Sequence, residues 1–270
     1  MSSSKTHTKK YFITPAELLM LRQPTGSSAD EIITCTLKEL VLNGALKADV
    51  VRSKNIFDEA DMAHTYILRG ERFHDFKSLP FHSLYLQPFK KKPIKVPTHL
   101  YAYKVLHLYQ EDLTKVKKAI HNELISKGYS RKSFLNFFGR FHLTDTGKKL
   151  VSEIEEFIQY AETHLAYQMK HAPLDALEII RKLGPHISLL ENFSFQEMDV
   201  WRVKLIKELS KIDSPDELIE NHEFPWLYYT DEENQTLDMR LIFDKNTAFK
   251  LLGERFDKAI EFGLESDFGT

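Results

Sequence analysis

Apolar residues recur at helical spacing in several separate stretches of this chain. The clearest cover residues 28–42, 112–127 and 144–165, where apolar side chains lie three or four positions apart. Shorter stretches alternate as strands do, at 45–52 with 65–68 and at 129–134 with 140–143. The pattern therefore predicts a mainly α protein with short β-hairpins.

Boundary signals divide this pattern into parts. Thr14-Pro15-Ala16-Glu17 has the residues of a capped helix start, and Gly44 and Gly128 stand where helices are expected to stop. Residues 88–97 hold three prolines and four lysines, which predicts an extended connector and excludes a helix. We expect a flexible N-terminus at 1–10, modules at 11–87 and 98–170, and an acidic, mostly helical region with one hairpin at 171–270.

One part of the chain carries a family resemblance. The segment 122–129 ends a helix at Gly128, a short hairpin is predicted next, and Leu143-Thr144-Asp145-Thr146-Gly147-Lys148-Lys149-Leu150 then starts another helix. Over about residues 112–150 this resembles the winged-helix module of transcription regulators. Residues 28–69 repeat the order of helix, glycine and hairpin. The resemblance predicts tandem winged-helix-like modules, followed by the C-terminal acidic helical region.

The resemblance also implies a way of binding DNA. The helix at 112–127 would enter the major groove and the wing at 136–140 would touch the backbone or the minor groove. The cations that would neutralise phosphates are Lys117, Lys118, Lys127, Arg131, Lys132 and Arg140, with His121 and Asn122 as the side chains suited to reading bases. The aromatic wing tip, Phe137-Phe138, suits a protein partner better. A solvated lysine face is the simpler alternative.

Charge is distributed unevenly along the chain. Residues 1–150 carry 25 Lys and Arg against 14 Asp and Glu, whereas residues 151–270 carry 12 against 25. Between Lys77 and Lys149 there are 15 basic and 4 acidic residues. Such segregation predicts either an anionic partner for the basic half or docking of the two halves on each other.

The composition narrows the class of protein. With 42% hydrophobic and 28% charged residues the chain should fold, and it has neither an apolar run of membrane-spanning length nor a signal-like N-terminus. We therefore expect a cytoplasmic protein with no membrane contact. Cys35 is the single cysteine, and its place in an apolar helical pattern predicts a buried, inert thiol.

Catalytic and metal-binding signatures are missing from the sequence. His164 and His171 lie seven positions apart without a carboxylate in an obvious ligand position, so we expect no metal site. Glycine-rich phosphate loops and the nucleophile elbow are also missing, and no cofactor is predicted.

Three functional hypotheses remain. The first is a non-enzymatic binding protein for DNA or another anionic macromolecule. The second is a protein–protein interaction adaptor that uses Phe137 and Phe138. The third is an enzyme whose catalytic residues are dispersed along the chain, which a pocket with converging His, Asp or Glu would reveal.

Overall fold

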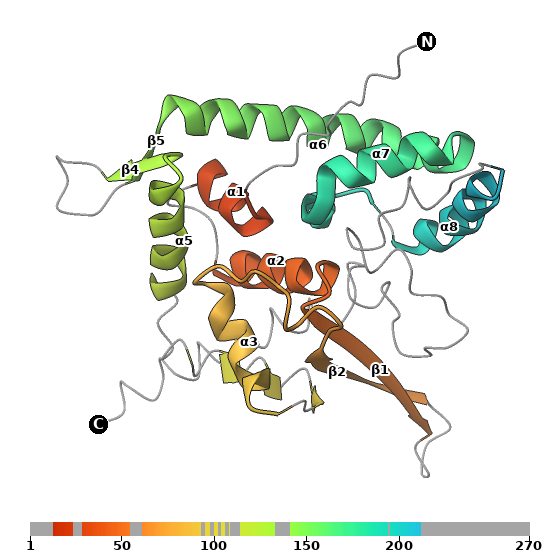
Figure 1. Ribbon diagram of the computed structural model, residues 1–270, viewed down its shortest axis with the longest axis horizontal. Helices are drawn as coiled ribbons and strands as arrows, with labels where there is room; N and C mark the ends of the chain where they lie inside the picture. The colour runs from red at the N-terminus through yellow and green to blue at the C-terminus, as the bar shows by residue number, and fades with distance from the viewer. Residues whose placement is uncertain are drawn as a thin grey trace.

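The computed structural model describes residues 13–23, 29–54, 61–92, 95–97, 114–132, 141–193 and 195–211, together with residues 100, 101, 104, 105 and 108. In these residues the chain is mainly helical with short antiparallel strands, as the pattern predicts. Figure 1 shows the longest helix, α6, along one edge, with α1 and α2 beneath it and α5 at one end. The N-terminal segment 1–10, the hairpin expected in 171–270 and the end of that region lie outside the described residues.

Two helices, α1 (Pro15–Arg22) and α2 (Ala29–Leu42), form the centre of the molecule. The capping signal before α1 is confirmed, because the Thr14 hydroxyl accepts the Glu17 N–H at 3.1 Å and the Glu17 carboxylate accepts the Thr14 N–H at 2.7 Å. In α2, Glu31 is the one exposed side chain among residues 31–42. Thr34 and Lys38, on the same side as Glu31, are half-buried, and the rest of the helix is buried in the interior of the protein.

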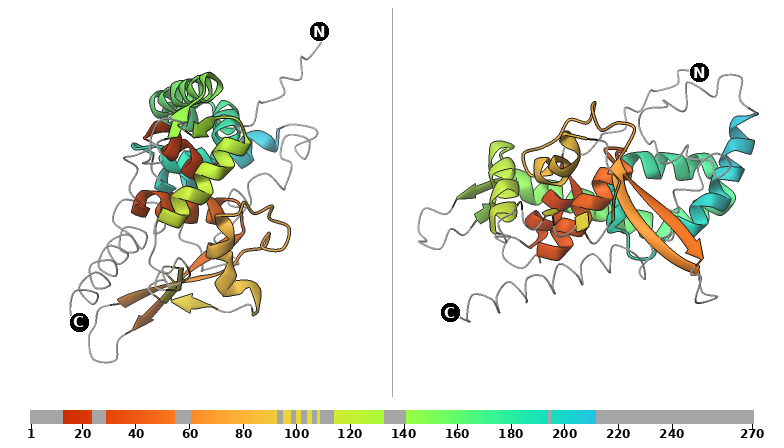
Figure 2. Two further views of the ribbon diagram at one scale, coloured as in Figure 1. Left: turned by 90° about the vertical axis from the view of Figure 1, so that its left-hand side faces the viewer. Right: turned by 90° about the horizontal axis from the view of Figure 1, so that it is seen from below.

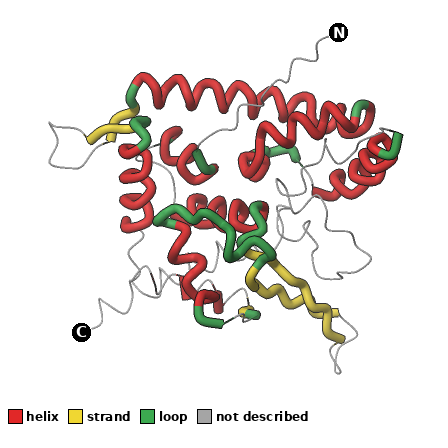
Figure 3. The backbone as a smooth tube through the Cα atoms, in the orientation of Figure 1, coloured by secondary structure: helices red, strands yellow, loops and turns green. Residues whose placement is uncertain are grey.

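A long hairpin follows α2 and projects from the helical body (Figures 1 and 3). Its strands are β1 (Leu46–Lys54) and β2 (Asp61–Arg69), paired from Leu46 opposite Arg69 to Lys54 opposite Asp61. A third strand, β3 (Val96–Pro97), pairs with Tyr66 and Ile67 of β2. The end of the expected connector is thus part of the sheet.

The helix α3 (His82–Lys90) shows that one expectation was wrong, because Pro88 lies inside it. Proline removes one backbone hydrogen bond and crowds the preceding turn, which is why a helix was excluded there. The bond that Pro88 cannot make would have gone to the Leu84 carbonyl oxygen, four residues earlier in α3. At the end of the helix, where the last carbonyl groups lack intrahelical donors, the Arg69 guanidinium donates to the carbonyl oxygens of Phe89 at 2.7 Å and Lys90 at 3.0 Å.

The second half of the described chain is a run of helices around α6 (Asp145–His171). It begins with α5 (Thr114–Ser126) and a two-stranded hairpin, β4 (Ser130–Lys132) and β5 (Phe141–Leu143). After α6 come α7 (Pro173–Leu183), the 3₁₀ helix η1 (Gly184–Leu189) and α8 (Phe195–Leu209). α7 and α8 both pack against α6, and the indole N–H of buried Trp201 donates to the Pro173 carbonyl oxygen at 3.1 Å. Figure 2 shows these helices from two further sides.

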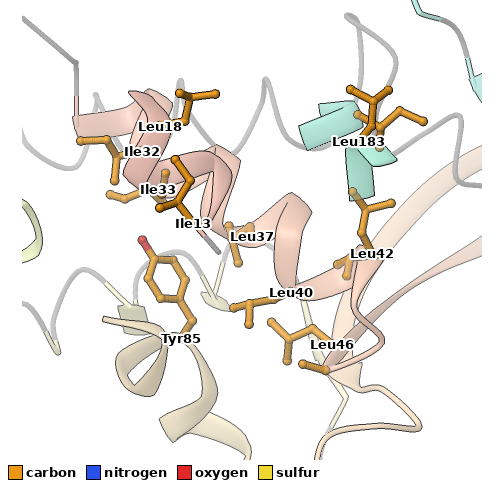
Figure 4. Packing of buried hydrophobic residues seen from close by; sticks show 14 of the residues in the cluster. Ile13, Leu18, Ile32, Ile33, Leu37, Leu40, Leu42, Leu46, Tyr85 and Leu183 are labelled. Carbon is orange, nitrogen blue, oxygen red and sulfur yellow. The ribbon is translucent and has the colours of Figure 1, made fainter. Parts of the chain in front are cut away.

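A continuous hydrophobic cluster extends from Ile13 to Leu209 and includes Val96, Tyr101 and Val105. It therefore crosses the boundary expected within residues 88–97. Figure 4 shows the side chains of α2 in this cluster, with Tyr85 of α3 facing Leu37 and Leu40. The Tyr101 hydroxyl donates to the Tyr85 carbonyl oxygen at 2.8 Å, which joins the two segments next to this core.

Cys35 lies within α2 and is buried, as expected. Its sulfur atom is 3.9 Å from the Ser188 hydroxyl oxygen. Burial, with a smaller effect of the Glu39 charge, raises the pKa of the thiol to about 12. Because the thiolate is the reactive form, this cysteine is chemically inert at neutral pH.

A buried ion pair joins α1 to the end of α5. The Glu17 side chain is fully buried, and its Oε1 atom lies 2.7 Å from Nζ of Lys127. Lys127 also lies 3.6 Å from the Glu123 carboxylate. Burial raises the pKa of Glu17, while the hydrogen bond from Lys127 opposes that shift. The carboxylate thus depends on Lys127 to remain charged inside the protein.

Replacing Lys127 with Met should lower the free energy of unfolding by about 3 kcal/mol, because it leaves the Glu17 carboxylate buried without its cation. Exposed Lys118, on the same helix, is the matched control, and Lys118→Met should change stability by less than about 0.5 kcal/mol. Urea unfolding at neutral pH measures both changes. Equal stability of the two variants would contradict a structural role for the pair.

Candidate nucleic-acid interface

The helix α5 separates a buried face from an exposed one. Val116, Ile120 and Leu124 are buried at helical spacing. Lys115, Lys118, Asn122 and Ser126 are exposed, also three or four positions apart. We call these four residues the outer face of α5.

The turn after α5 sets the direction of the hairpin. Gly128 has φ of 75°, its N–H donates to the Ile125 carbonyl oxygen at 3.0 Å, and the Tyr129 N–H donates to that of Leu124 at 2.9 Å. This pair of bonds is the Schellman motif, which requires a left-handed residue and so favours glycine. The same pair closes α2, where Gly44 (φ 70°) donates to Val41 and Ala45 to Leu40, both at 2.9 Å.

The wing-like hairpin itself is short. Ser130 pairs with Leu143, Arg131 with His142 and Lys132 with Phe141. Arg131, Lys132 and His142 are exposed, whereas Ser130 is buried. The expected wing tip, with Phe137, Phe138 and Arg140, lies outside the described residues.

The start of α6 closes the hairpin against the turn. The Thr144 hydroxyl accepts the Gly147 N–H at 3.0 Å and donates to the Gly128 carbonyl oxygen at 2.8 Å. A Cβ atom added to Gly147 would collide with the backbone carbonyl of Tyr129. Gly147 is therefore needed because the first turn of α6 touches the backbone that leaves α5.

The cations predicted to contact phosphate occupy three kinds of environment. Lys118, Arg131 and Lys132 are exposed, and none of them forms an ion pair with another described residue. Lys117 is partly buried on the flank of α5. Lys127 is held by Glu17 and Glu123, so its charge is already compensated inside the protein.

His121 does not lie on the outer face, so the expectation that it reads bases was wrong. Its side chain is buried and stacks on Phe141, with ring centroids 3.5 Å apart and an interplanar angle of 21°. Burial, with a smaller effect of the Lys117 charge, lowers the pKa of His121 to about 4. The neutral ring therefore acts as an aromatic packing partner between α5 and strand β5 of the hairpin.

Charged groups at the start of α6 flank this surface. Lys148 pairs with Asp145 at 3.1 Å, and Lys149 lies 4.0 Å from Glu153, both on the surface of α6. Arg22 of α1 pairs with Glu155 of α6 at 2.9 Å, an ion pair between the basic and acidic halves of the sequence. Exposed ion pairs such as Lys148–Asp145 and Lys149–Glu153 contribute little to the free energy of folding. Because such pairs open easily, these two lysine side chains stay accessible to solvent.

A second group of charged residues was not predicted from the sequence. Lys77, Arg181, Lys182, Glu39 and His82 come from four segments of the chain and line one cleft. Such a site has no spacing motif, since its members are more than 100 positions apart at the extremes. Only the fold brings them together.

The histidines of this cleft do not have the arrangement of an acid–base catalyst. His82 accepts the Leu79 N–H on Nδ1 at 3.1 Å, and its Nε2 lies 3.4 Å from the Glu39 carboxylate. Both ring nitrogens are thus turned toward the protein. Burial lowers the pKa of His186 to about 4, although its hydrogen bond to the Leu183 backbone opposes the shift.

The described residues contain no group of three or more His, Cys, Asp or Glu side chains arranged to hold a metal ion. His164 instead stacks on Tyr160 with ring centroids 4.2 Å apart, and the His171 ring is tilted against Tyr167 at 4.5 Å, both along α6. Among the described helices none combines the length and apolar character that crossing a membrane requires.

Comparisons with family models, with curated proteins and with solved structures found no match for this chain. Any functional inference therefore has to come from the geometry and charge of the described residues.

Replacing Gly147 with Ala should lower the free energy of unfolding by about 3 kcal/mol, because the added methyl group overlaps backbone rather than a movable side chain. Gly128→Ala is the matched control. Its new Cβ would meet nothing within 4 Å, so only the left-handed backbone is penalised, at about 1 kcal/mol. Urea denaturation ranks the two variants, and a smaller loss for Gly147→Ala would contradict the close contact.

His121→Phe should make the protein less sensitive to acid. The pKa of His121 is about 4 when folded against a reference of 6.5, so the unfolded chain binds more protons and stability falls as pH drops from 6.5 to about 4. Phenylalanine keeps the stack on Phe141 and removes this loss. His186, also near 4, contributes the same loss to both proteins. Thermal midpoints at pH 4, 5.5 and 7 measure the difference, with exposed His142→Phe as the control.

Proposed function

We propose that this chain is a non-enzymatic nucleic-acid-binding protein whose α5 and β4–β5 hairpin dock on duplex DNA as a winged-helix-like module. The observation that carries the proposal is that Lys118, Arg131 and Lys132 are exposed on one continuous unit of helix and hairpin, without ion pairs to other described residues. Exposed cations without ion-pair partners bind the phosphate groups of DNA, because this binding releases the counterions that were condensed on the phosphates.

The shape of α5 supports contact with the major groove. A helix of 13 residues is about 20 Å long and about 10–12 Å wide, and the major groove is about 12 Å wide. The outer face presents Lys115 and Lys118 toward solvent, followed by Asn122 one turn later. Asparagine is suited to a paired hydrogen bond with adenine, so Asn122 is the proposed base-reading residue in place of His121.

Within the part of the chain that the structure describes, this unit lies at one end. Figure 1 shows the hairpin at the end of α5 and α1 on the opposite side of that helix, toward the body of the protein. In the left view of Figure 2, both α5 and the hairpin lie at the end that faces the viewer. The other described helices therefore leave the outer face of α5 uncovered.

The first helix–glycine–hairpin copy supports a different role. Its turn has the same hydrogen bonds as the turn after α5, which favours a tandem arrangement. However, most side chains of α2 are buried, and only Glu31, Thr34 and Lys38 along one side reach the surface in part, so this helix is not available to enter a groove. We assign the copy at 28–69 to the core of the protein and the copy at 112–150 to contact with DNA.

A protein–protein adaptor is the second candidate function, favoured by one observation. Val200, Val203 and Ile206 of α8 are 61%, 70% and 59% exposed, and their spacing places them along one side of the helix. A row of exposed aliphatic side chains is typical of a surface that contacts another protein. It lies on a different element from the proposed DNA contact, so the two functions are compatible.

Fluorescence anisotropy with a mixed-sequence duplex at low salt tests the proposal. The full chain should bind with a Kd of about 1–100 μM that weakens steeply as salt is added. Replacing Lys118, Arg131 and Lys132 together with Gln should weaken binding at least about tenfold and reduce the slope of log K against log salt by about 3.

The matched control removes the same charge from the end of α3, by replacing exposed Lys90, Lys91 and Lys92 with Gln. This control should bind almost as the unmodified chain does. Absence of binding by the unmodified chain would exclude the nucleic-acid function and leave the adaptor. Equal weakening by both triple variants would show that net charge, rather than this surface, attracts DNA.

A further inference from the structure

A cleft of about 270 Å³ opens where α1, α2, α5 and the turn from α7 to η1 meet. Ile13 and Thr14 form one side of it, and Leu183, Gly184 and Pro185 form another. Gly184 has φ of 54°, which turns the chain sharply out of α7 and brings η1 to the edge of the cleft. The volume is slightly below the usual range of small-molecule sites, about 300–1,000 Å³, so a small ligand is expected.

Cationic side chains from three segments line this cleft. Lys77 comes from the loop before α3, Arg181 and Lys182 come from the last turn of α7, and Lys127 follows α5. Lys77 is exposed and forms no ion pair with a described residue. Nζ of Lys182 lies 4.0 Å from the centroid of the Phe157 ring, an aromatic partner that does not neutralise its charge.

Negative charge within the cleft is turned away from these cations. Glu39 is the one carboxylate among the described lining residues, and it is 3% exposed. Its carboxylate faces Nε2 of buried His82 at 3.4 Å. The rings of Phe76 and Phe81 pack on the same imidazole, with centroids 5.4 and 4.3 Å away. The buried Glu39–His82 pair therefore lies at the floor of the cleft, and the other charged side chains that line it are all cationic.

The lining also contains five apolar side chains, Ile13, Phe76, Leu79, Leu183 and Pro185, beside the polar Thr14, Asn43 and His186. A cleft lined by several cations and by apolar side chains fits an anion that carries an organic group. Lys77, Arg181 and Lys182 are three cationic side chains among the lining residues, against the single carboxylate of Glu39. Lysine and arginine donate charge-assisted hydrogen bonds to phosphate oxygen atoms. We propose that this cleft binds a small organic phosphate, with the phosphate at the three cations and the organic group against the apolar walls.

This binding site goes beyond the proposed contact with DNA and uses other residues. The outer face of α5 and the hairpin do not line the cleft. Lys127 is the one residue that connects the two regions, since it follows α5 and lines the cleft. Because the other residues of the two sites differ, binding of a ligand in the cleft and binding of a duplex can be measured separately, and either can fail while the other holds.

Isothermal titration calorimetry on the full chain, with phenyl phosphate as the probe, tests the site. We expect saturable binding that Lys77→Gln weakens about tenfold, because it removes one charge-assisted hydrogen bond to the phosphate. Arg181→Gln should weaken binding at least as much. Lys90→Gln removes an equally exposed lysine outside the cleft and should leave the affinity unchanged. Inorganic phosphate and benzoate should both bind more weakly than phenyl phosphate.

The outcomes separate the parts of the proposal. No binding of phenyl phosphate, or unchanged affinity in Lys77→Gln, would overturn the site. Benzoate binding as tightly as phenyl phosphate would overturn the phosphate assignment, and inorganic phosphate binding as tightly would overturn the role of the apolar walls. Arg181 is less exposed than Lys77, so its replacement can also destabilise the fold. The thermal midpoint of each variant without ligand detects such a loss. If Arg181→Gln is destabilised, the affinity of Lys77→Gln alone decides whether the site exists.

Discussion

The buried carboxylate of Glu17 is the constraint around which the described fold is organised. Its hydrogen bond to the Thr14 N–H fixes the start of α1, and its contact with Lys127 fixes the end of α5 against that helix. α1 in turn packs on α2, α5, α6 and η1. A single charged group inside the protein thus positions the proposed DNA-binding helix, and its partner Lys127 also lines the cleft proposed for an organic phosphate.

Local signals in the sequence predicted local structure well. The capping box at Thr14 and Glu17, the glycines that end α2 and α5, and the hairpin before α6 all follow from short-range sterics and hydrogen bonding. Long-range partners could not be predicted in this way. Glu17 was fully explained as a cap, which gave no sign of Lys127, 110 positions away. Likewise Pro88 indicated a break, and the sequence gives no sign that Arg69 donates to the carbonyl oxygens at the end of α3.

The candidate interface was predictable to the extent that it follows helical periodicity. The apolar positions of α5 correctly placed Lys118 on the exposed side, whereas strict alternation along β4 would not expose Arg131 and Lys132 together. His121 was misjudged because it borders the apolar positions and stacks on Phe141 of β5, a partner 20 positions away. The cleft residues could not be grouped at all from sequence, because α7 and the loop before α3 meet only in the folded chain.

The hydrogen bond from Thr144 to the turn at Gly128 joins the end of α5 to the start of α6, on the helical side of the β4–β5 hairpin. Since the Thr144 hydroxyl holds the Gly128 carbonyl and α6 starts directly against Tyr129, both ends of the intervening segment are fixed by backbone contacts within the scaffold. The packing of α5 and α6 on each other's ends is therefore set by residues outside the segment between the two strands, so substitutions in that segment should leave both helices in place.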